Sequence, residues 1–180
     1  MREVAFQRCI NPDCAATFGI DQVLFSCPSC GSLLDVDYQW DRMAIPRYMS
    51  FFESRWATRG SALDFSGVWR FRELLAFVDE EDIITIGEGR TNLQRADRLA
   101  REIGMKPGRL FLQYEGLNPS GSFKDNGMTA AFSIARALGR HRVACASTGN
   151  TSAAVAMFAS LAVARDGRPM QGIVFIGSGK

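Results

Sequence analysis

Short apolar runs alternate with stretches of helical hydrophobic spacing from about residue 83 to the end of this 180-residue chain. Such alternation is typical of a parallel sheet whose strands are joined by right-handed helical crossovers. The sequence therefore predicts an α/β fold built on a parallel sheet. We expect strands at 82–87, 109–115, 142–147 and 172–177, and helices at 92–104, 122–138 and 151–165.

The chain divides into three segments of different composition. Residues 1–37 hold four of the five cysteines, and residues 38–82 are rich in aromatic side chains and arginine. We expect a small cysteine-rich segment, an irregular or helical connector, and an α/β domain over 83–180. An open parallel sheet needs a covering helix after its last strand. We therefore expect the α/β domain to be truncated, as in an N-terminal fragment.

Charge and hydropathy argue against two classes of partner. The net charge is only +2, because the basic residues are matched by nearly as many carboxylates, so we expect no nucleic-acid binding. The longest apolar run, 153–164, is too short to span a bilayer, so we expect no membrane partner. The first 20 residues lack the apolar run of a secretory signal, which favours a cytoplasmic location.

The cysteines of the first segment have the pairing of a metal site. The gaps between them are four, twelve and two residues, and paired cysteines on two tight turns supply the four soft ligands that zinc prefers. Metal would also replace the core that 37 residues can hardly build. The alternatives are reduced cysteines without a ligand, or a ribbon that needs no metal. The predicted zinc ligands are Cys9, Cys14, Cys27 and Cys30.

Lys124 lies in "NPSGSFKDNGMTAA" and is one of only three lysines in the chain. Ser122 is a good N-cap, which places the lysine in the first turn of the predicted helix. The partial positive charge of a helix N-terminus and apolar burial both favour an uncharged amine, the form that condenses with an aldehyde. Arginine cannot do this chemistry. The alternative is an ordinary exposed lysine in a first helical turn.

A second polar segment, "ASTGNTSAA" at 146–154, lies between a predicted strand and a predicted helix of small residues. Hydroxyls and free amides at a helix start form a cradle for an anion, and the side chain of Asn150 offers both a donor and an acceptor. The alternative is a plain cap and turn rich in serine and threonine. The segment alone is therefore a weak indicator of a site.

Together the two segments resemble the fold-type II enzymes that use pyridoxal 5'-phosphate, the tryptophan-synthase-β-like superfamily, and within it most closely the threonine synthases. "GEGRTNL" at 87–93 is similar to that family's "GEG-x-TPL" segment, with Asn92 in place of proline. The cysteine-rich front is similar to the leader of many threonine synthases. The resemblance covers essentially the whole chain.

The resemblance implies a function and a set of roles. Lys124 would form the Schiff base with the cofactor, Asn150 would hydrogen-bond the phenolic oxygen of its ring, and Phe123 would pack beside the ring. The implied reaction converts O-phospho-L-homoserine and water to L-threonine and phosphate. The partner is a small-molecule amino-acid phosphate, and a homodimer is compatible with the full-length family members. Side chains implied to hold the substrate are Ser147, Thr148 and Thr151.

Other functions stay open from the sequence. The superfamily also includes threonine/serine dehydratases and cysteate synthases. The cysteate synthases share much of the sequence of the lysine and asparagine motifs. A non-catalytic zinc-ribbon protein is a further alternative, although residues 1–37 hold two basic against five acidic residues and would repel phosphates. Since the glycine-rich loop that grips the cofactor phosphate in the family is absent from these 180 residues, we expect this piece to be inactive alone.

Overall fold

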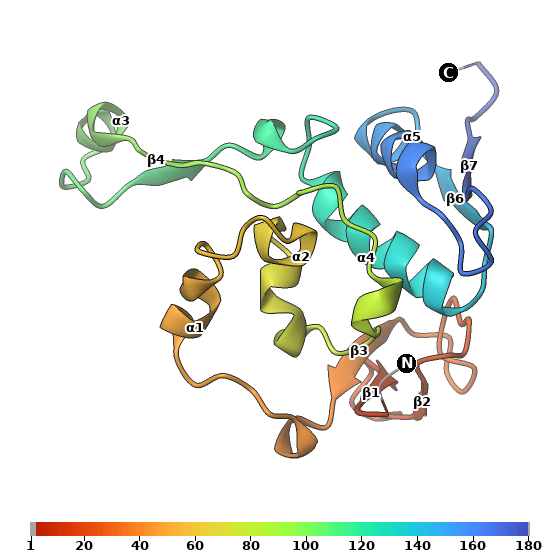
Figure 1. Ribbon diagram of the computed structural model, residues 1–180. Helices are drawn as coiled ribbons and strands as arrows, with labels where there is room; N and C mark the ends of the chain where they lie inside the picture. Colours follow the sequence, from red (N-terminus) through yellow and green to blue (C-terminus); the bar gives the residue numbers. More distant parts are fainter. Residues whose placement is uncertain (1–2, 180) are drawn as a thin grey trace.

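The computed structural model describes residues 3–179, and its strands form three small sheets (Figure 1). The first sheet has the order β2-β1-β3, the second pairs β4 with β5, and the third pairs β6 with β7. Helices α4 and α5 lie against the third sheet, and the short helices of the connector lie on the other side of α4 (Figure 1). The described residues therefore form an α/β structure, as predicted.

The N-terminal sheet is antiparallel and carries the cysteine-rich loops. Its strands are β1 (Ala5–Cys9), β2 (Thr17–Gly19) and β3 (Leu34–Tyr38). An ion pair between Arg8 and Asp37 links β1 to β3. Because only Ala5, Cys9 and Cys27 of this segment are buried apolar side chains, the sheet has almost no core of its own.

The connector predicted at 38–82 contains five short helices. They are η1 (Trp40–Arg42), α1 (Met49–Ser54), α2 (Ala62–Phe65), η2 (Trp69–Leu74) and η3 (Glu80–Asp82). The buried Trp69 anchors the connector to the helix that begins at Lys124, because its indole nitrogen donates a 2.6 Å hydrogen bond to the Thr129 hydroxyl.

The C-terminal part contains the only parallel strand pair of the described residues. It runs α4 (Lys124–Ala137), β6 (Arg142–Ala146), α5 (Asn150–Leu161), β7 (Gln171–Phe175), and Arg142 pairs with Gln171 at the start of the two strands. The predicted helices 122–138 and 151–165 and the predicted strands 142–147 and 172–177 are thereby confirmed, although α5 ends four residues early.

The core lies where α4, α5 and β7 meet. The rings of Phe132 and Phe158 stack with their centroids 5.6 Å apart, and Val155 and Met170 are buried beside them. Gly172 lets β7 approach α5 closely, because a β-carbon at this position would lie 2.8 Å from a methyl carbon of Val155. Close-packed apolar contacts of this kind hold the two helices on the parallel pair.

Two of the predicted elements are different in the structure. Within the helix predicted over 92–104, residues Leu93–Arg95 form β4, and the helix α3 covers only Asp97–Glu102. The strand predicted at 109–115 is β5 (Phe111–Gln113), and it pairs antiparallel with β4 instead of joining a parallel sheet. This hairpin and α3 extend away from the rest of the chain (Figure 1).

The prediction of a strand at 82–87 is wrong, because η3 ends at Asp82 and the apolar residues after it form a loop. Its backbone groups bond to side chains of α4 in place of a neighbouring strand. The amide of Ile84 donates to the Ser133 hydroxyl at 2.9 Å, and the carbonyl of Ile84 accepts from the Thr129 hydroxyl at 2.6 Å. Buried backbone groups need partners, and here two hydroxyls supply them.

A single parallel sheet is therefore not present in residues 3–179, where the parallel pairing is limited to β6 and β7. The α/β class is confirmed, whereas the larger parallel sheet expected from the alternation of strands and helices is not confirmed. None of the helices in this described range is both long and apolar enough to cross a bilayer.

Replacing Thr129 tests the buried hydroxyl contacts. We expect Thr129→Val to lower the free energy of unfolding by about 1–3 kcal/mol, because the Trp69 indole loses its acceptor and the Ile84 carbonyl loses its donor. Thr129→Ser keeps the hydroxyl and is the matched control. Urea unfolding of the three proteins measures the difference, and equal losses for the two variants would contradict the contact.

Candidate functional site

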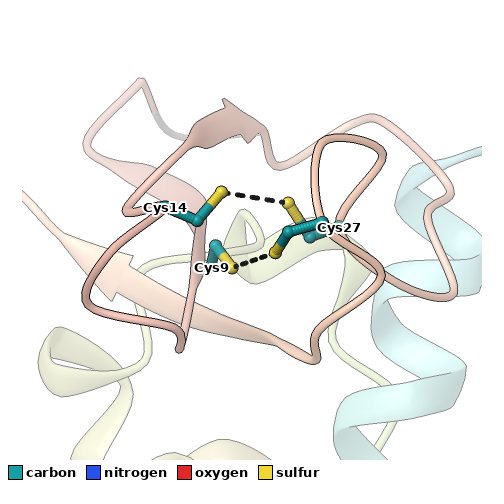
Figure 2. A group of neighbouring side chains, drawn as sticks. Cys9, Cys14 and Cys27 are labelled. Carbon is teal, nitrogen blue, oxygen red and sulfur yellow. Dashed lines mark hydrogen bonds between the residues drawn. The ribbon is translucent and has the colours of Figure 1, made fainter.

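The four cysteines predicted to bind zinc come together in the structure. Their sulfur atoms all lie within 4.8 Å of one another, with 3.5 Å between Cys9 and Cys30 and 3.8 Å between Cys14 and Cys27. The side chains of Cys9, Cys14 and Cys27 point into one space between two loops (Figure 2). Zinc bound tetrahedrally at about 2.3 Å from each sulfur would place the sulfurs about 3.8 Å apart. The cluster is therefore the right size for one tetrahedral ion.

Backbone turns place these cysteines. After Cys14, Ala15 adopts a left-handed conformation with φ +47°, and after Cys30, Gly31 does so with φ +75°. The Gly31 amide donates to the Cys27 carbonyl at 2.8 Å, which closes the second turn. Each turn reverses the chain directly after a cysteine, so that two pairs of sulfurs face each other.

The cysteines of the cluster differ in the direction of their pKa shifts. Hydrogen bonds from the hydroxyl and the amide of Ser32 lower the pKa of the Cys30 thiol to about 6. Burial raises the pKa of the Cys9 thiol to about 12, because a lone thiolate there is poorly solvated. Metal ligation is the usual means of keeping such a buried thiol ionised.

Lys124 is the first residue of α4, at the place predicted for it. Its amine is 4.3 Å from the centroid of the Phe123 ring, and within residues 3–179 it makes no hydrogen bond or ion pair. The side chain is half-buried, and Phe123 is 54% exposed, so the amine does not lie in the apolar pocket that was expected. It is instead free to meet a ligand from solvent.

The turn before Lys124 is held by a buried carboxylate. Asp125 is fully buried and accepts hydrogen bonds from the amide of Ser120, at 2.7 Å, and from its hydroxyl. The helix N-cap is Phe123 and not Ser122, but the Ser122 hydroxyl still accepts from the Lys124 amide at 3.3 Å. A buried carboxylate in the first turn also interacts favourably with the helix dipole. These contacts fix the position from which the lysine projects.

The second predicted segment forms the loop between β6 and α5. The Ser147 hydroxyl accepts from the Gly149 amide at 3.2 Å, and the Ser152 hydroxyl donates to the Gly149 carbonyl at 2.6 Å. Thr148 and Asn150 are exposed, and Thr151 is half-buried. The first amides of α5 have no partners within the helix, so the loop presents donors together with hydroxyls.

The topology brings the lysine and this loop to the same end of the molecule. A turn at 138–141, with Gly139 at φ +64°, reverses the chain between α4 and β6, which pack against each other. Helix α4 is about 21 Å long and β6 about 17 Å. The start of α4 therefore lies near the end of β6, on the side where both helices begin (Figure 1). No hydrogen bond joins the two segments among the described residues.

The "GEG" segment is tied to the lysine segment by side chains that sequence reasoning did not single out. The Gly89 amide donates to the Asn118 side-chain oxygen at 2.8 Å. The side-chain amide of Asn118 in turn donates to the carboxylate of Glu115 at 2.8 Å. The side-chain amide of Asn126 donates to the same carboxylate at 3.1 Å. The run of polar residues around the lysine was the available signal, but which of them bond to each other depends on the fold.

Glu88 holds the other side of the same loop. It is fully buried and accepts from the hydroxyl of Ser66 at 2.7 Å and from the amide of Ile86 at 2.9 Å. Gly67 and Gly89 touch through their backbones, since a β-carbon on Gly67 would lie 2.1 Å from the Gly89 carbonyl carbon. The connector, the loop and the start of α4 thus form one hydrogen-bonded unit.

The arrangement suits an aldehyde cofactor with a phosphate group. It offers one amine without a partner, an exposed aromatic ring beside it, and a second helix start with free donors. A cavity of about 820 Å³ lies elsewhere, beside the N-terminal sheet, and none of the residues that line it belongs to the Lys124 or Asn150 segments.

Comparison with known proteins first identifies a matching family. Residues 84–164 match the model of the family described as pyridoxal-phosphate dependent enzyme. This range holds both helix starts, with Lys124 and Asn150. The resemblance to enzymes that use this cofactor, predicted from the motifs, is confirmed.

Individual relatives of the chain are threonine synthases. The chain is 41% identical to the threonine synthase of Methanosarcina acetivorans over 155 residues, which is 86% of this chain and 34% of the relative. It is 38% identical to that of Methanocaldococcus jannaschii over 174 residues, or 97% of this chain and 38% of the relative. The chain thus resembles threonine synthases and spans about a third of their length.

Metal analysis tests the cysteine cluster. After refolding with Zn²⁺ and desalting, we expect one ion per chain, and a loss of bound metal in Cys27→Ser, because three sulfurs leave the tetrahedron open. Cys145→Ser removes a cysteine of β6 outside the cluster and should keep the metal. Elemental analysis of the three proteins measures this, and equal metal in all three would contradict the site.

Proposed function

We propose that this chain supplies the part of a threonine synthase of the fold-type II class that carries the cofactor lysine. The reaction of the whole enzyme is the conversion of O-phospho-L-homoserine and water to L-threonine and phosphate. The observation that supports it most is the Lys124 amine, which projects without a polar partner from a helix start at the same end as the Asn150 loop. The threonine synthase relatives give the substrate class.

The residues of this chain have separate tasks in the proposal. The Lys124 amine would hold the cofactor through its aldehyde group, and it would accept and return protons at the substrate Cα. Asn150 orients the ring through its amide, and Phe123 packs beside the ring. When bound, the pyridine ring supplies an electron sink next to the substrate Cα.

The loop after β6 would hold the negative groups of the substrate. Ser147, Thr148 and Thr151 carry hydroxyls at the start of α5, where amides without helical partners favour an anion. The hydroxyl of Ser147 already bonds to the Gly149 amide, which fixes the loop conformation. The exposed Thr148 is therefore the hydroxyl most available to a ligand.

The cysteine cluster has a structural task in the proposal. We assign it to zinc, because four thiolates at tetrahedral spacing match that ion. All four positions are filled by protein sulfur, which leaves no open coordination site for catalysis. A cytoplasmic location, where thiols stay reduced, is consistent with metal ligation by these cysteines.

Covalent labelling tests the lysine. In the full-length gene product incubated with pyridoxal phosphate and reduced with borohydride, we expect the cofactor on the peptide that contains Lys124, and its loss in Lys124→Ala. Lys106→Ala is the matched control, because Lys106 is exposed and lies outside both motifs. Mass spectrometry locates the label. Labelling of Lys124→Ala as strong as that of Lys106→Ala would refute the assignment.

Product analysis separates the related activities. With phosphohomoserine we expect equal amounts of threonine and phosphate from the full-length gene product, since each turnover adds one water and releases one phosphate. Phosphoserine with sulfite tests for a cysteate synthase, and threonine alone tests for a dehydratase. A faster reaction with either of these than with phosphohomoserine would reassign the enzyme within the superfamily.

A further inference from the structure

Three arginines lie beside aromatic rings where the connector meets the "GEG" loop. The guanidinium carbons of Arg59 and Arg90 lie 4.8 Å and 4.6 Å from the centroid of the Trp56 ring. That of Arg70 lies 4.5 Å from the Phe71 ring. We call Arg59, Arg70, Arg90 and Trp56 the arginine cluster. Two cations on one indole are unusual, because like charges repel.

The cluster has no neutralising carboxylate among residues 3–179. Arg59 donates to the Trp56 carbonyl at 2.8 Å, and Arg90 donates to the carbonyls of Asp64, at 2.8 Å, and Phe65. These acceptors are uncharged, so they hold the guanidinium groups without cancelling their charge. The Nε atom of Arg70 is buried without a hydrogen-bond partner.

Asp64, whose backbone carbonyl binds Arg90, has a carboxylate that is already engaged by other groups. Asp64 is 2.8 Å from Arg72 and 3.5 Å from Arg55, and it accepts a 2.6 Å hydrogen bond from the Thr58 hydroxyl. Glu73 pairs with Arg55. Asp64 and Glu73 thus form ion pairs with Arg55 and Arg72, which lie outside the cluster, and the cluster keeps its positive charge.

The positive charges of the cluster act on one another. Burial lowers the pKa of the Arg90 guanidinium, and the positive charges of Arg70 and Arg59 lower it further. Cations that destabilise one another gain when an anion enters between them. Trp56 adds a flat apolar surface that is 55% exposed.

We propose that the arginine cluster is a binding site for a phosphate monoester, formed by Arg59, Arg70 and Arg90 and bordered by Trp56. Planar guanidinium groups bond phosphate oxygens in pairs, and three of them match a dianion better than a single carboxylate. The exposed indole suits a ligand that carries a flat or apolar body beside its phosphate. The site uses none of the residues assigned to the cofactor.

Binding there would have a structural effect. Arg59 and Arg70 belong to the connector, whereas Arg90 follows Gly89 in the loop that bonds to Asn118. An anion held by all three would tie the connector to that loop. Because a ligand that binds only the folded state stabilises it, phosphate should raise the melting temperature.

The test uses inorganic phosphate as the probe and calorimetric titration of the chain without cofactor. We expect Arg59→Gln and Arg90→Gln each to weaken phosphate binding about tenfold, since each removes a charge-assisted contact. Arg109→Gln removes the same charge from an exposed residue outside the cluster and should bind like the parent. Arg59→Gln is the more informative variant, because within residues 3–179 the Arg59 side chain makes one hydrogen bond, to the Trp56 carbonyl.

Two results would overturn the site. One is an equal effect of phosphate and of chloride at matched ionic strength on the melting temperature, which would show general screening. The other is a loss of phosphate binding in Lys124→Ala while Arg59→Gln still binds phosphate like the parent. That result would place the anion at the lysine. Retained phosphate binding in Lys124→Ala supports the cluster even if the proposed enzyme activity fails.

Discussion

The hydroxyl groups that α4 buries hold together segments that are distant in sequence. Thr129 and Ser133 satisfy the backbone of Ile84, and Thr129 also accepts from the indole of Trp69. A buried hydroxyl is costly unless it is bonded, so these contacts permit only one arrangement of the three segments. The remaining contacts of the loop follow from this arrangement.

One helix therefore has two tasks. Its middle faces the core with Phe132 and the two hydroxyl groups, whereas its first residue, Lys124, is only half-buried. The buried Asp125 between them fixes the turn before the lysine. A reactive amine is more precisely placed on such an element than on a free loop, because the rigid part of the helix sets its position.

The sequence allowed some elements to be predicted well and others poorly, for physical reasons. Helices α4 and α5 and strands β6 and β7 follow from local hydrophobic spacing, and the cysteine cluster follows from paired spacing. The apolar run at 82–87 looked like a strand, because its true partners are hydroxyls more than 40 residues away. The pairing of β4 with β5 was likewise hidden within a helical pattern.

The candidate site was predictable to a similar extent. The positions of Lys124 and Asn150 at helix starts could be read from caps and small residues. The partial burial of the lysine could not, since it depends on how the preceding turn packs. The arginine cluster was not foreseen, because its members are spread from residue 56 to residue 90 and share no motif.

The contact between Gly67 and Gly89 limits how this molecule can change over generations. The two segments meet through bare main chain, so no larger residue can be accepted at position 67 without opening the joint. A substitution that disturbs packing is often compensated by a change in the neighbouring side chain, but neither Gly67 nor Gly89 has a side chain that could change in this way. The spacing between the connector and the loop is thus fixed by the dimensions of the peptide unit itself, and drift elsewhere in both segments must leave this joint intact.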